Sequence, residues 1–443
     1  MTHWTKEAMP VTRALETTET DQDLPRRTGV VVIGVSTAQS LAEQGVAVTL
    51  VEKGRIAGEQ SSRNWGWCRT AGRDTAEIPL AVESVRMWER MAARVGADVG
   101  FRRAGVVYVC AIQRDMDGYA AWLETAQTYQ VGSRLLDADA TANLLPESGR
   151  RWAGCLYTPA DGRAEPQHAV PKMAIAARRL GVVILEGCAA RGLDIAAGRV
   201  AGVVTERGTI ACDAVVLAGG AWSRLFCGNQ GVDFPQLKIL GSVMRTAPMA
   251  GPDFAVGGAD FAFRRRADGG YTIAQRNAME AAIVPDSIRQ FRQFAPALLK
   301  QRRELRLQVS PRQFMAEWRT PRRWALDSPS PFEAVRVLDP KPSQANLDAG
   351  RANLVQAFPG FADMKVEESW GGMVDVTPDG VPVIGPVPDV AGFYLASGFS
   401  GHGFGIGPGA GRLMADLVTG ASPVVDPAPF RFERLTASQR MAA

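Results

Sequence analysis

The chain has 443 residues, of which 46% are hydrophobic and 22% are charged, and its formal net charge is +4. This length and composition predict a globular protein of about two or three domains with a large core. The mixed charge argues against nucleic acid as a partner, the three histidines lack the spacing of a metal site, and no stretch reaches the roughly 18 apolar residues that a membrane span needs.

The N-terminal segment and the cysteines bear on where the protein acts. Residues 1–28 are polar and contain Pro10 and Pro25, so we expect a disordered tail and not a signal or membrane anchor. The six cysteines form no C-x-x-C pair. This fits reduced thiols and predicts a cytoplasmic location.

The first regular elements form a βαβ unit. In VVVIGVSTAQSLAEQG, residues 30–33 read as a buried strand, and the helix that follows ends at Gly45. A second strand, residues 46–51, leads to Glu52, the position at which dinucleotide-binding folds hold a ribose with an acidic side chain. Gly34 falls where the third glycine of G-x-G-x-x-G would stand. About five residues of the phosphate-binding turn are therefore absent relative to the usual spacing.

Helices and strands alternate through the middle of the chain. We expect a helix at residues 78–95, a strand pair at 105–112, helical structure over 118–145, a helix ending at Gly181, and strands at 182–185 and 214–218. FAFRRRADGGYTIAQ alternates around an Asp-Gly-Gly turn and predicts a hairpin. The C-terminal part returns to strand, glycine-rich loop and helix. Nucleotide-binding signals thus occur at the beginning, middle and end, which predicts a discontinuous cofactor domain.

Residues 289–323 are strongly basic, with ten Lys and Arg residues against two Glu residues and with apolar residues between them. Two interpretations stay open. The segment is either the solvated face of a helical subdomain, or a docking surface for anionic lipid or a protein partner.

Four stretches together, VEKGRIAGEQSSRNWG, CAARGLDIAAGRVAGVVTERG, LAGGAWSRLF and SGFSGHGFGIGPGAGRLMADL, resemble the D-amino-acid oxidase (DAO) superfamily of FAD-dependent oxidoreductases. The resemblance is strongest to bacterial L-amino acid deaminases and extends to glycine and sarcosine oxidases. It implies an α/β (α+β) fold with a discontinuous Rossmann-like FAD-binding domain, residues 29–95, 150–235 and 365–430. A mixed-sheet substrate domain, residues 96–149 and 236–364, would carry the basic helical segment 286–325 as an insertion.

The resemblance also implies which residues bind FAD. Glu52 would accept hydrogen bonds from the ribose, and the glycine-rich start of the last helix would stabilise negative charge on the reduced flavin. Sarcosine oxidases carry a flavin-linked cysteine where this chain has Gly372, so we expect non-covalent FAD. The implied cofactor-binding residues are Gly34, Glu52, Lys53, Ser61, Ser62, Arg63, Ala189, Ala218, Gly219, Gly220, Trp222, Gly401, His402, Gly403, Phe404 and Gly405.

A substrate carboxylate needs its own partner, because the lysine that sarcosine oxidases carry after GHGF is Gly405 here. The resemblance points to Arg264, in the F-x-F-R strand, as the main anchor and to Arg69 as a helper, with His402 near the reacting atoms. Each has a structural alternative, which is an ion pair for the arginines and support of the loop for His402. The pocket walls, or else the core, would include Trp65, Trp67, Trp370 and Phe399.

The predicted reaction is oxidation of the C–N bond of an amino acid or N-substituted amino acid to an imine. The imine then hydrolyses to a keto acid plus ammonia or an amine, and oxygen or another acceptor takes the electrons. Two alternatives stay open. The shortened turn would suit a protein that keeps the fold with weak or lost FAD binding. The basic segment would suit a membrane-docked dehydrogenase that passes electrons to quinone through a weak membrane-surface contact of residues 289–323.

Overall fold

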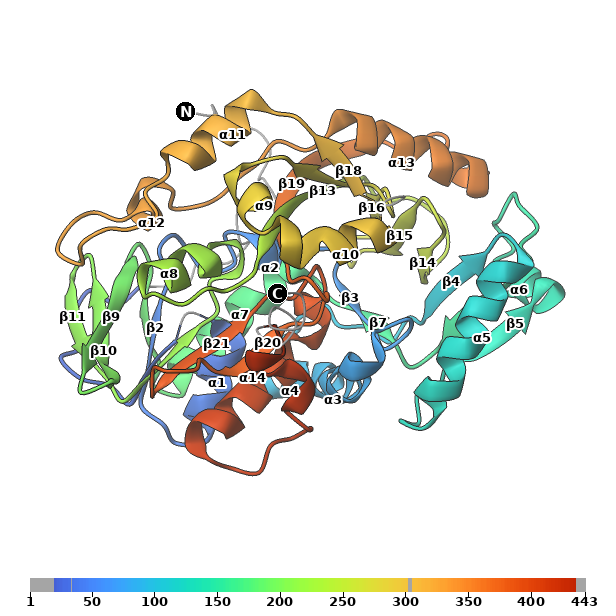
Figure 1. Ribbon diagram of the computed structural model, residues 1–443. Coiled ribbons are helices and arrows are strands. Elements are labelled where there is room, and N and C mark those ends of the chain that lie inside the picture. The colour runs from blue at the N-terminus through green and yellow to red at the C-terminus, as the bar shows by residue number, and fades with distance from the viewer. Residues whose placement is uncertain (1–19, 33, 302–304, 436–443) are drawn as a thin grey trace.

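Two sheets organise the chain in the computed structural model, which describes residues 20–32, 34–301 and 305–435 (Figure 1). Among these residues, one sheet has six strands in the order β20-β21-β12-β1-β2-β8, and a mixed sheet has ten strands. The expected mixed α/β fold is confirmed. In the six-stranded sheet, β20 alone is antiparallel to its neighbour. Its strands are β1 (Val30–Val32), β2 (Val48–Val51), β8 (Val183–Leu185), β12 (Ala214–Leu217), β20 (Val383–Pro386) and β21 (Phe393–Ser397).

The six-stranded sheet is buried on both faces, which is why its strands are short apolar runs. Val30 and Val32 belong to a core shared with the helices, whereas Val31 between them belongs to the core on the other face. The packed helices are α1 (Val35–Glu43), α3 (Ile78–Glu89), α7 (Pro166–Arg179) and α14 (Gly403–Thr419). The opposite face is covered by the three-stranded sheet of β9 (Ala190–Ala196), β10 (Arg199–Thr205) and β11 (Gly208–Ala211).

The ten-stranded sheet joins distant parts of the chain. Its long central strands, β13 (Leu237–Thr246) and β19 (Val366–Val376), are antiparallel. The predicted hairpin is present as β15 (Ala262–Arg265) and β16 (Tyr271–Ala274), with Arg264 opposite Thr272. The other strands are β4 (Val106–Cys110), β5 (Arg134–Asp137), β6 (Gly154–Thr158), β14 (Ala255–Gly257), β17 (Met279–Ala282) and β18 (Leu305–Gln308).

Several expected elements differ from the structure. The helix expected at residues 78–95 is divided at Arg90 into α3 and α4 (Met91–Val95). The strand pair expected at 105–112 is the single strand β4, because its partners β6 and β14 lie far away in the sequence. Residues 118–145 are not continuously helical, since β5 separates α5 (Gln113–Gln127) from α6 (Ala138–Leu144). Tertiary pairing with β6, rather than sequence periodicity, makes β5 a strand.

The expected tail is ordered where the structure describes it. Residues 1–19 lie outside the described residues. In residues 20–28, Arg178 donates to Asp21 at 2.7 Å and the hydroxyl of Thr28 donates to the Ala47 carbonyl at 3.0 Å. The expected disorder is therefore not seen in residues 20–28, because Asp21 is held by α7 and β8 and Thr28 by the residue before β2.

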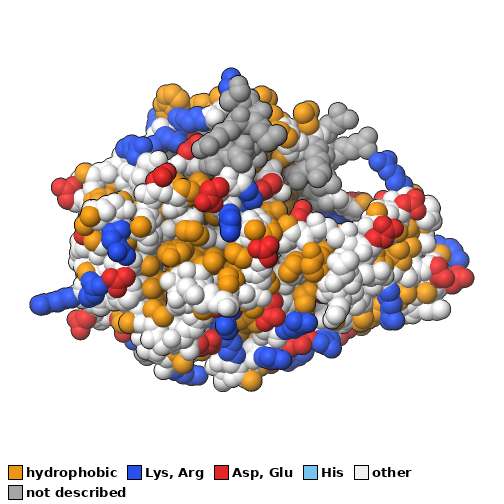
Figure 2. All heavy atoms as spheres, turned by 60° about the horizontal axis from the view of Figure 1, so that its bottom comes forward, with side chains coloured by type: hydrophobic (Ala, Val, Ile, Leu, Met, Phe, Trp, Pro, Cys, Tyr) orange, Lys and Arg blue, Asp and Glu red, His pale blue; other side chains and the backbone are white. Residues whose placement is uncertain are grey.

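The basic segment folds into α9 (Pro285–Arg289), α10 (Phe291–Gln301), β18 and α11 (Pro311–Arg319), near the top of Figure 1. Arg302, Arg303 and Glu304 lie outside the described residues. Within the described ranges, no helix is long and apolar enough to cross a membrane. Figure 2 shows one face of the molecule, on which basic and acidic side chains are interspersed with apolar ones.

The two sheets suggest a division of the chain into domains. β6 and β19 belong to the ten-stranded sheet. The sequence instead predicts residues 154–158 and 366–376 as part of the FAD-binding domain. We propose that the boundaries follow the sheets, with these two strands assigned to the substrate domain. The FAD-binding domain remains discontinuous in this division, because its sheet takes strands from residues 30–51, 183–217 and 383–397.

Candidate functional site

A cavity of about 1310 Å³ lies where the two sheets meet. The six-stranded sheet contributes Glu52 and Ala218, which follow the carboxyl ends of β2 and β12. The ten-stranded sheet contributes residues of β13 and β19, such as Ile239 and Met373. The starts of α1 and α14 face the same space, and α10 lines its far end through Phe294. Ligands of open α/β sheets bind at this edge of the strands.

Glu52 lies at one end of the cavity, as the βαβ pattern predicts. Its Oε1 accepts from the Gly54 N–H at 2.8 Å. Burial raises the pKa of Glu52 to about 7, although the Gly54 N–H and the charge of Lys53 act in the opposite direction. Hydroxyl donors from a ribose would favour the ionised carboxylate, so this environment suits a bound nucleoside.

The start of α1 opens directly into the cavity. Val35, Ser36 and Thr37 line it, and the first N–H groups of a helix have no partner within the helix. Gly34 is the N-cap and has no side chain to cap these donors. A Cβ atom at Gly34 would come within 2.8 Å of the Cβ of Ala218, so the close approach of α1 to β12 needs glycine here. The helix therefore keeps an anion-binding end despite the short turn before it.

The residues of the polar loop after β2 differ in whether they line the cavity. Ser61 lines the cavity, whereas Ser62 is buried away from it and its hydroxyl donates to a backbone carbonyl at 3.3 Å. Arg63 lines the cavity while its Nη1 donates to Asp339 at 2.6 Å and to the Gly371 carbonyl at 2.8 Å. Its buried Nε has no partner. Arg63 is thus a fixed cation at the cavity wall with one unused donor.

A side pocket of about 140 Å³ continues from Glu52 and is lined by Gly219, Gly220 and Trp222. Lys53 lies 4.5 Å from the centre of the Trp222 ring and 2.5 Å from Glu59. These contacts give Lys53 a structural partner. Ala189 is fully buried and is absent from the residues that line either space, but its neighbour Ala190 lines the side pocket.

Helix α14 packs against α1, and its glycine-rich start also borders the cavity. Gly401, His402, Gly403, Phe404 and Gly405 all line the cavity. A Cβ atom at Gly405 would lie 2.7 Å from the backbone oxygen of Trp67, so only glycine allows this approach.

These observations test whether FAD fits. One continuous space joins Glu52, two helix N-termini and the positively charged Arg63 side chain, which are the groups that a ribose, a pyrophosphate and an electron-rich ring would bind. The six cysteines are all buried, and none lines the cavity. The residues therefore fit non-covalent FAD. Within the described chain, no group of His, Cys, Asp and Glu could hold a metal ion.

His402 has two charged neighbours, Arg73, which also lines the cavity, and Glu77, which does not. Its Nδ1 lies 3.4 Å from Oε2 of Glu77, and Nη1 of Arg73 lies 3.9 Å from the same oxygen. Burial lowers the pKa of His402, and the charges of Arg73 and Arg69 lower it further, against the effect of Glu77. Arg73 and Glu77 were missed by sequence reasoning because no motif marks them.

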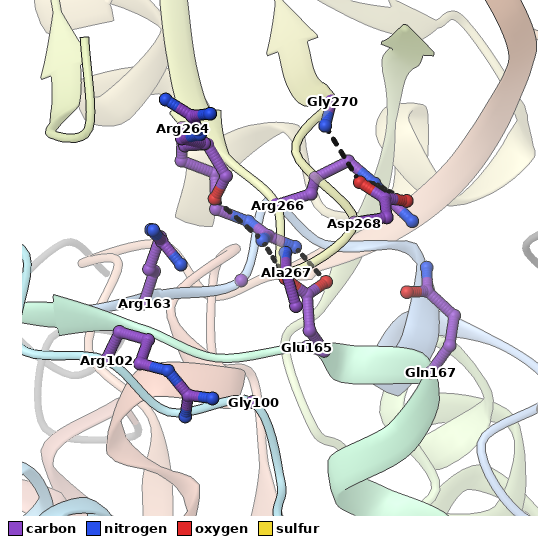
Figure 3. A network of polar contacts seen from close by, with 12 residues as sticks. Gly100, Arg102, Arg163, Glu165, Gln167, Arg264, Arg266, Ala267, Asp268 and Gly270 are labelled. Atoms are coloured by element: carbon purple, nitrogen blue, oxygen red, sulfur yellow. Dashed lines mark hydrogen bonds and ion pairs between the residues drawn. The ribbon is translucent and has the colours of Figure 1, made fainter. Parts of the chain in front are cut away.

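Arg264 does not line the cavity but belongs to the network of polar contacts drawn in Figure 3. Its side chain is 1% exposed, and its Nη1 and Nη2 donate to Glu165 at 2.7 and 3.0 Å. Its Nε donates to the Trp65 carbonyl at 2.5 Å. Glu165 also accepts from the Ala267 N–H at 2.8 Å, which ties the β15–β16 turn to the start of α7. This geometry matches the structural alternative, an ion pair at the seam, and gives no support to Arg264 as the carboxylate anchor.

Two other arginines line the cavity around one tyrosine. Arg69 and Arg276 lie 5.5 and 4.6 Å from the centre of the Tyr108 ring, and all three line the cavity. Arg276 also donates to the Gly258 carbonyl at 2.9 Å. Arg69 was expected, but Arg276 was missed. It follows β16, one strand from Arg264, so the hairpin pattern contained the signal for it.

The aromatic candidates divide between wall and core. Trp65, Trp67 and Phe399 line the cavity. Trp370 is 4% exposed, does not line the cavity, and its Nε1 donates to the Arg63 carbonyl at 3.0 Å.

Comparison with known proteins gives consistent results. Residues 32–417 match the model of the DAO family, described as FAD dependent oxidoreductase. Glycine oxidase from Pseudomonas aeruginosa is 25% identical over 91% of this chain and 96% of its own. L-amino acid deaminase from Proteus myxofaciens, solved in complex with anthranilate, has a TM-score of 0.92 and 33% identity and covers 95% of this chain and 96% of its own. The Proteus vulgaris L-amino acid deaminase has a TM-score of 0.90 and 31% identity over 95% of this chain and 100% of its own.

Proposed function

The chain belongs to the DAO family of FAD-dependent oxidoreductases, and on that premise we propose that it oxidises the C–N bond of an amino acid or N-substituted amino acid to an imine, which water hydrolyses to a keto acid. The observation that carries this proposal is that one cavity joins the Glu52 end to Arg69 and Arg276. A nucleotide and a small carboxylate can therefore occupy one continuous space.

We assign the cofactor to the residues that line this space. Glu52 would hold the ribose, the N-terminus of α1 with Ser61 and Arg63 the pyrophosphate, and the start of α14 the electron-rich end of the flavin. When bound, FAD supplies the acceptor for two electrons. The protein holds the substrate, orients its C–H bond and excludes water from the reacting atoms.

We propose that Arg69 and Arg276 hold the substrate carboxylate in place of Arg264. Both line the cavity and lie over the Tyr108 ring, and each already donates to one backbone carbonyl, Arg69 to Ala71 and Arg276 to Gly258. A guanidinium has five N–H donors, so each arginine can bind a carboxylate in addition to these contacts. Arg264 lacks this freedom because Glu165 already occupies both of its Nη groups.

Steady-state turnover tests both proposals on FAD-loaded protein with a panel of amino acids and the matching simple amines. We expect keto acid from at least one amino acid. Arg276→Gln should lower kcat/KM at least about tenfold on the amino acid, since a charge-assisted hydrogen bond contributes about 1.5–3 kcal/mol, but much less on the amine. The control is Arg265→Gln, which removes an arginine of β15 that does not line the cavity. Flavin-loaded protein that oxidises no amino acid or amine would refute the proposed function.

A second proposal concerns the molecule that takes the electrons from the flavin. We propose that this acceptor is a quinone, which the protein reaches by docking on an anionic membrane surface. The cavity extends under α10, where Phe291, Phe294 and Leu298 line it. The same segment exposes Leu299 (70%) and Trp318 (64%) to solvent. An apolar route from the flavin site to an apolar surface, with exposed arginines beside it, suits a lipophilic acceptor in anionic lipid.

Vesicle sedimentation tests the membrane contact. We expect binding to vesicles that contain phosphatidylserine and little binding to neutral phosphatidylcholine, and Trp318→Ser should weaken the former several-fold. The control is Ile195→Ser, at an exposed apolar residue of β9. Equal binding by the variant and the parent would contradict the contact, and oxygen would then be the acceptor to test. We also propose a cytoplasmic location, which the six buried, unpaired cysteines support.

A further inference from the structure

Behind the wall of the cavity lies a carboxylate that the proposed function has not used. Glu77 is the last residue of a short 3-10 helix, Thr75–Glu77, and immediately precedes α3. Its side chain is 0% exposed, and neither carboxylate oxygen has a hydrogen-bond partner. A buried carboxylate without such partners is costly unless nearby charges compensate for its lost hydration. The charges around Glu77 must therefore supply this compensation.

The charged groups that act on Glu77 belong to His402, Arg73 and Arg69. Nδ1 of His402 is 3.4 Å from Oε2 of Glu77, and Arg73 Nη1 is 3.9 Å from it. His402 Nδ1 is itself buried and without a hydrogen-bond partner, yet the side chain is 30% exposed and lines the cavity. The ring therefore turns its Nδ1 edge toward Glu77 and its other edge, which carries Nε2, toward the cavity.

We propose that Glu77 is a positioning residue that holds His402 as the Nδ1–H tautomer, so that Nε2 is a neutral acceptor for an N–H of the substrate's amino group. The amino-group role rests on the proposed function, whereas the tautomer does not. An ionised carboxylate beside Nδ1 attracts the proton to that nitrogen, and a neutral imidazole then has its lone pair on Nε2. The same relation orients the histidine of hydrolytic triads.

The surrounding charges keep each group in the required state. Burial raises the pKa of Glu77, but the His402 contact and the charges of Arg73 and Arg69 outweigh this, so the pKa lies below its ordinary value. The pKa of His402 is also lowered, by burial first and then by Arg73 and Arg69. The resting pair is therefore a carboxylate and a neutral imidazole at neutral pH.

This arrangement gives the substrate ammonium group a place to lose its proton. The N–H bond of the ammonium breaks and an Nε2–H bond forms, with no change of oxidation state, and the resulting imidazolium is paired with the Glu77 carboxylate. The free amine then carries a nitrogen lone pair that favours breaking of the α-carbon C–H bond, and FAD, when bound, would supply the electron acceptor. A substrate carboxylate at Arg69 offsets part of the positive charge that lowers the pKa of His402, so substrate binding itself favours this transfer.

The tautomer can be measured without turnover. The chain has three histidines, His3, His168 and His402, so the 15N spectrum of histidine-labelled protein contains few signals, and His402→Gln assigns one set. We expect a protonated Nδ1 and an unprotonated Nε2 for His402 near neutral pH. Glu77→Gln should shift the population toward Nε2–H, because an amide can donate to Nδ1. The control is Glu83→Gln, at a partly exposed carboxylate on α3.

The kinetic prediction distinguishes positioning from simple structural support. In FAD-loaded protein, activity should fall at acidic pH as His402 becomes protonated. Glu77→Gln should lower kcat on an amino acid at least tenfold and move this acidic limb to lower pH, since the imidazolium loses its counter-charge. An Nε2–H tautomer in the unaltered protein would overturn the proposal even if Glu77→Gln does not fold. An unchanged acidic limb in a folded variant would also overturn it. Absence of all amino acid oxidation with the expected tautomer would instead refute the proposed function.

Discussion

Glu52 is the side chain through which pH should act on cofactor binding. Its pKa in the folded protein is about 7, above the ordinary value of 4.5, because burial disfavours the carboxylate. The stability that comes from the protonated form is complete below the unfolded pKa and is lost as pH rises through about 7. In the proposed FAD site, in contrast, the ionised form of Glu52 would accept hydrogen bonds from the ribose hydroxyls.

Glu52→Gln should therefore act in opposite directions on stability and binding. At pH 8 we expect a higher melting temperature for the FAD-free variant than for the parent, with the difference disappearing near pH 4.5. FAD affinity at pH 8 should fall at least about tenfold, from loss of charge-assisted hydrogen bonds. Calorimetry and FAD fluorescence quenching measure the two effects. Equal affinity in parent and variant would mean that the ribose does not contact Glu52.

Arg264 should behave as a structural residue. Arg264→Ala leaves Glu165 buried without its main partner, and breaking such a pair costs about 3–5 kcal/mol in the free energy of unfolding. Any loss of turnover should then be equal on an amino acid and on the matching amine. The double variant Arg264→Met with Glu165→Gln removes both charges and should recover much of the stability in urea denaturation. A loss confined to amino acids would restore Arg264 as a carboxylate anchor.

At the scale of elements, we predict that the connection between β1 and α1 limits how strongly the pyrophosphate of FAD is bound. Val35 is already the first residue of α1, and a full phosphate-binding turn would add further backbone N–H donors. We predict that the chain as written binds FAD weakly and that inserting Gly-Gly-Ile-Ile-Gly after residue 33 tightens binding. Equilibrium dialysis compares the two proteins. Insertion of five residues after Gly198, in the exposed turn between β9 and β10, is the control. Stoichiometric flavin that does not dissociate from the chain as written would contradict the prediction.

Elements also differ in how much their sequence reveals. The runs that form β1, β2 and β12 are continuous and apolar because both faces of their sheet are covered, and the pattern was sufficient to find them. β5 is exposed at both ends and half-buried between them, so neither alternation nor a continuous apolar run marks it. Its hydrogen bonds to β6 alone define it as a strand.

At the scale of the whole molecule, non-covalent FAD should couple the two sheets. The cavity is lined from both sheets, so bound FAD stabilises the folded chain by an amount that grows with the logarithm of its free concentration. We expect the melting temperature to rise with added FAD and the yellow colour to stay in the supernatant after acid precipitation. Riboflavin, which lacks the phosphates and adenosine, is the control ligand. Colour in the pellet would reveal a covalent link and contradict the assignment at Gly372.

The sequence by itself determined the βαβ unit, through its apolar runs and one acid at a strand end, and its motifs identified the family by resemblance. Of the residues that it predicted for the site, Glu52, Arg63, Arg69 and the start of α14 line the cavity. Only the tertiary structure decided which arginine faces the cavity. Arg264 and Arg276 lie close in sequence, but Glu165, 99 residues before Arg264, neutralises the first and leaves the second beside Tyr108. Long-range partners of this kind follow from packing, and no local pattern contains them.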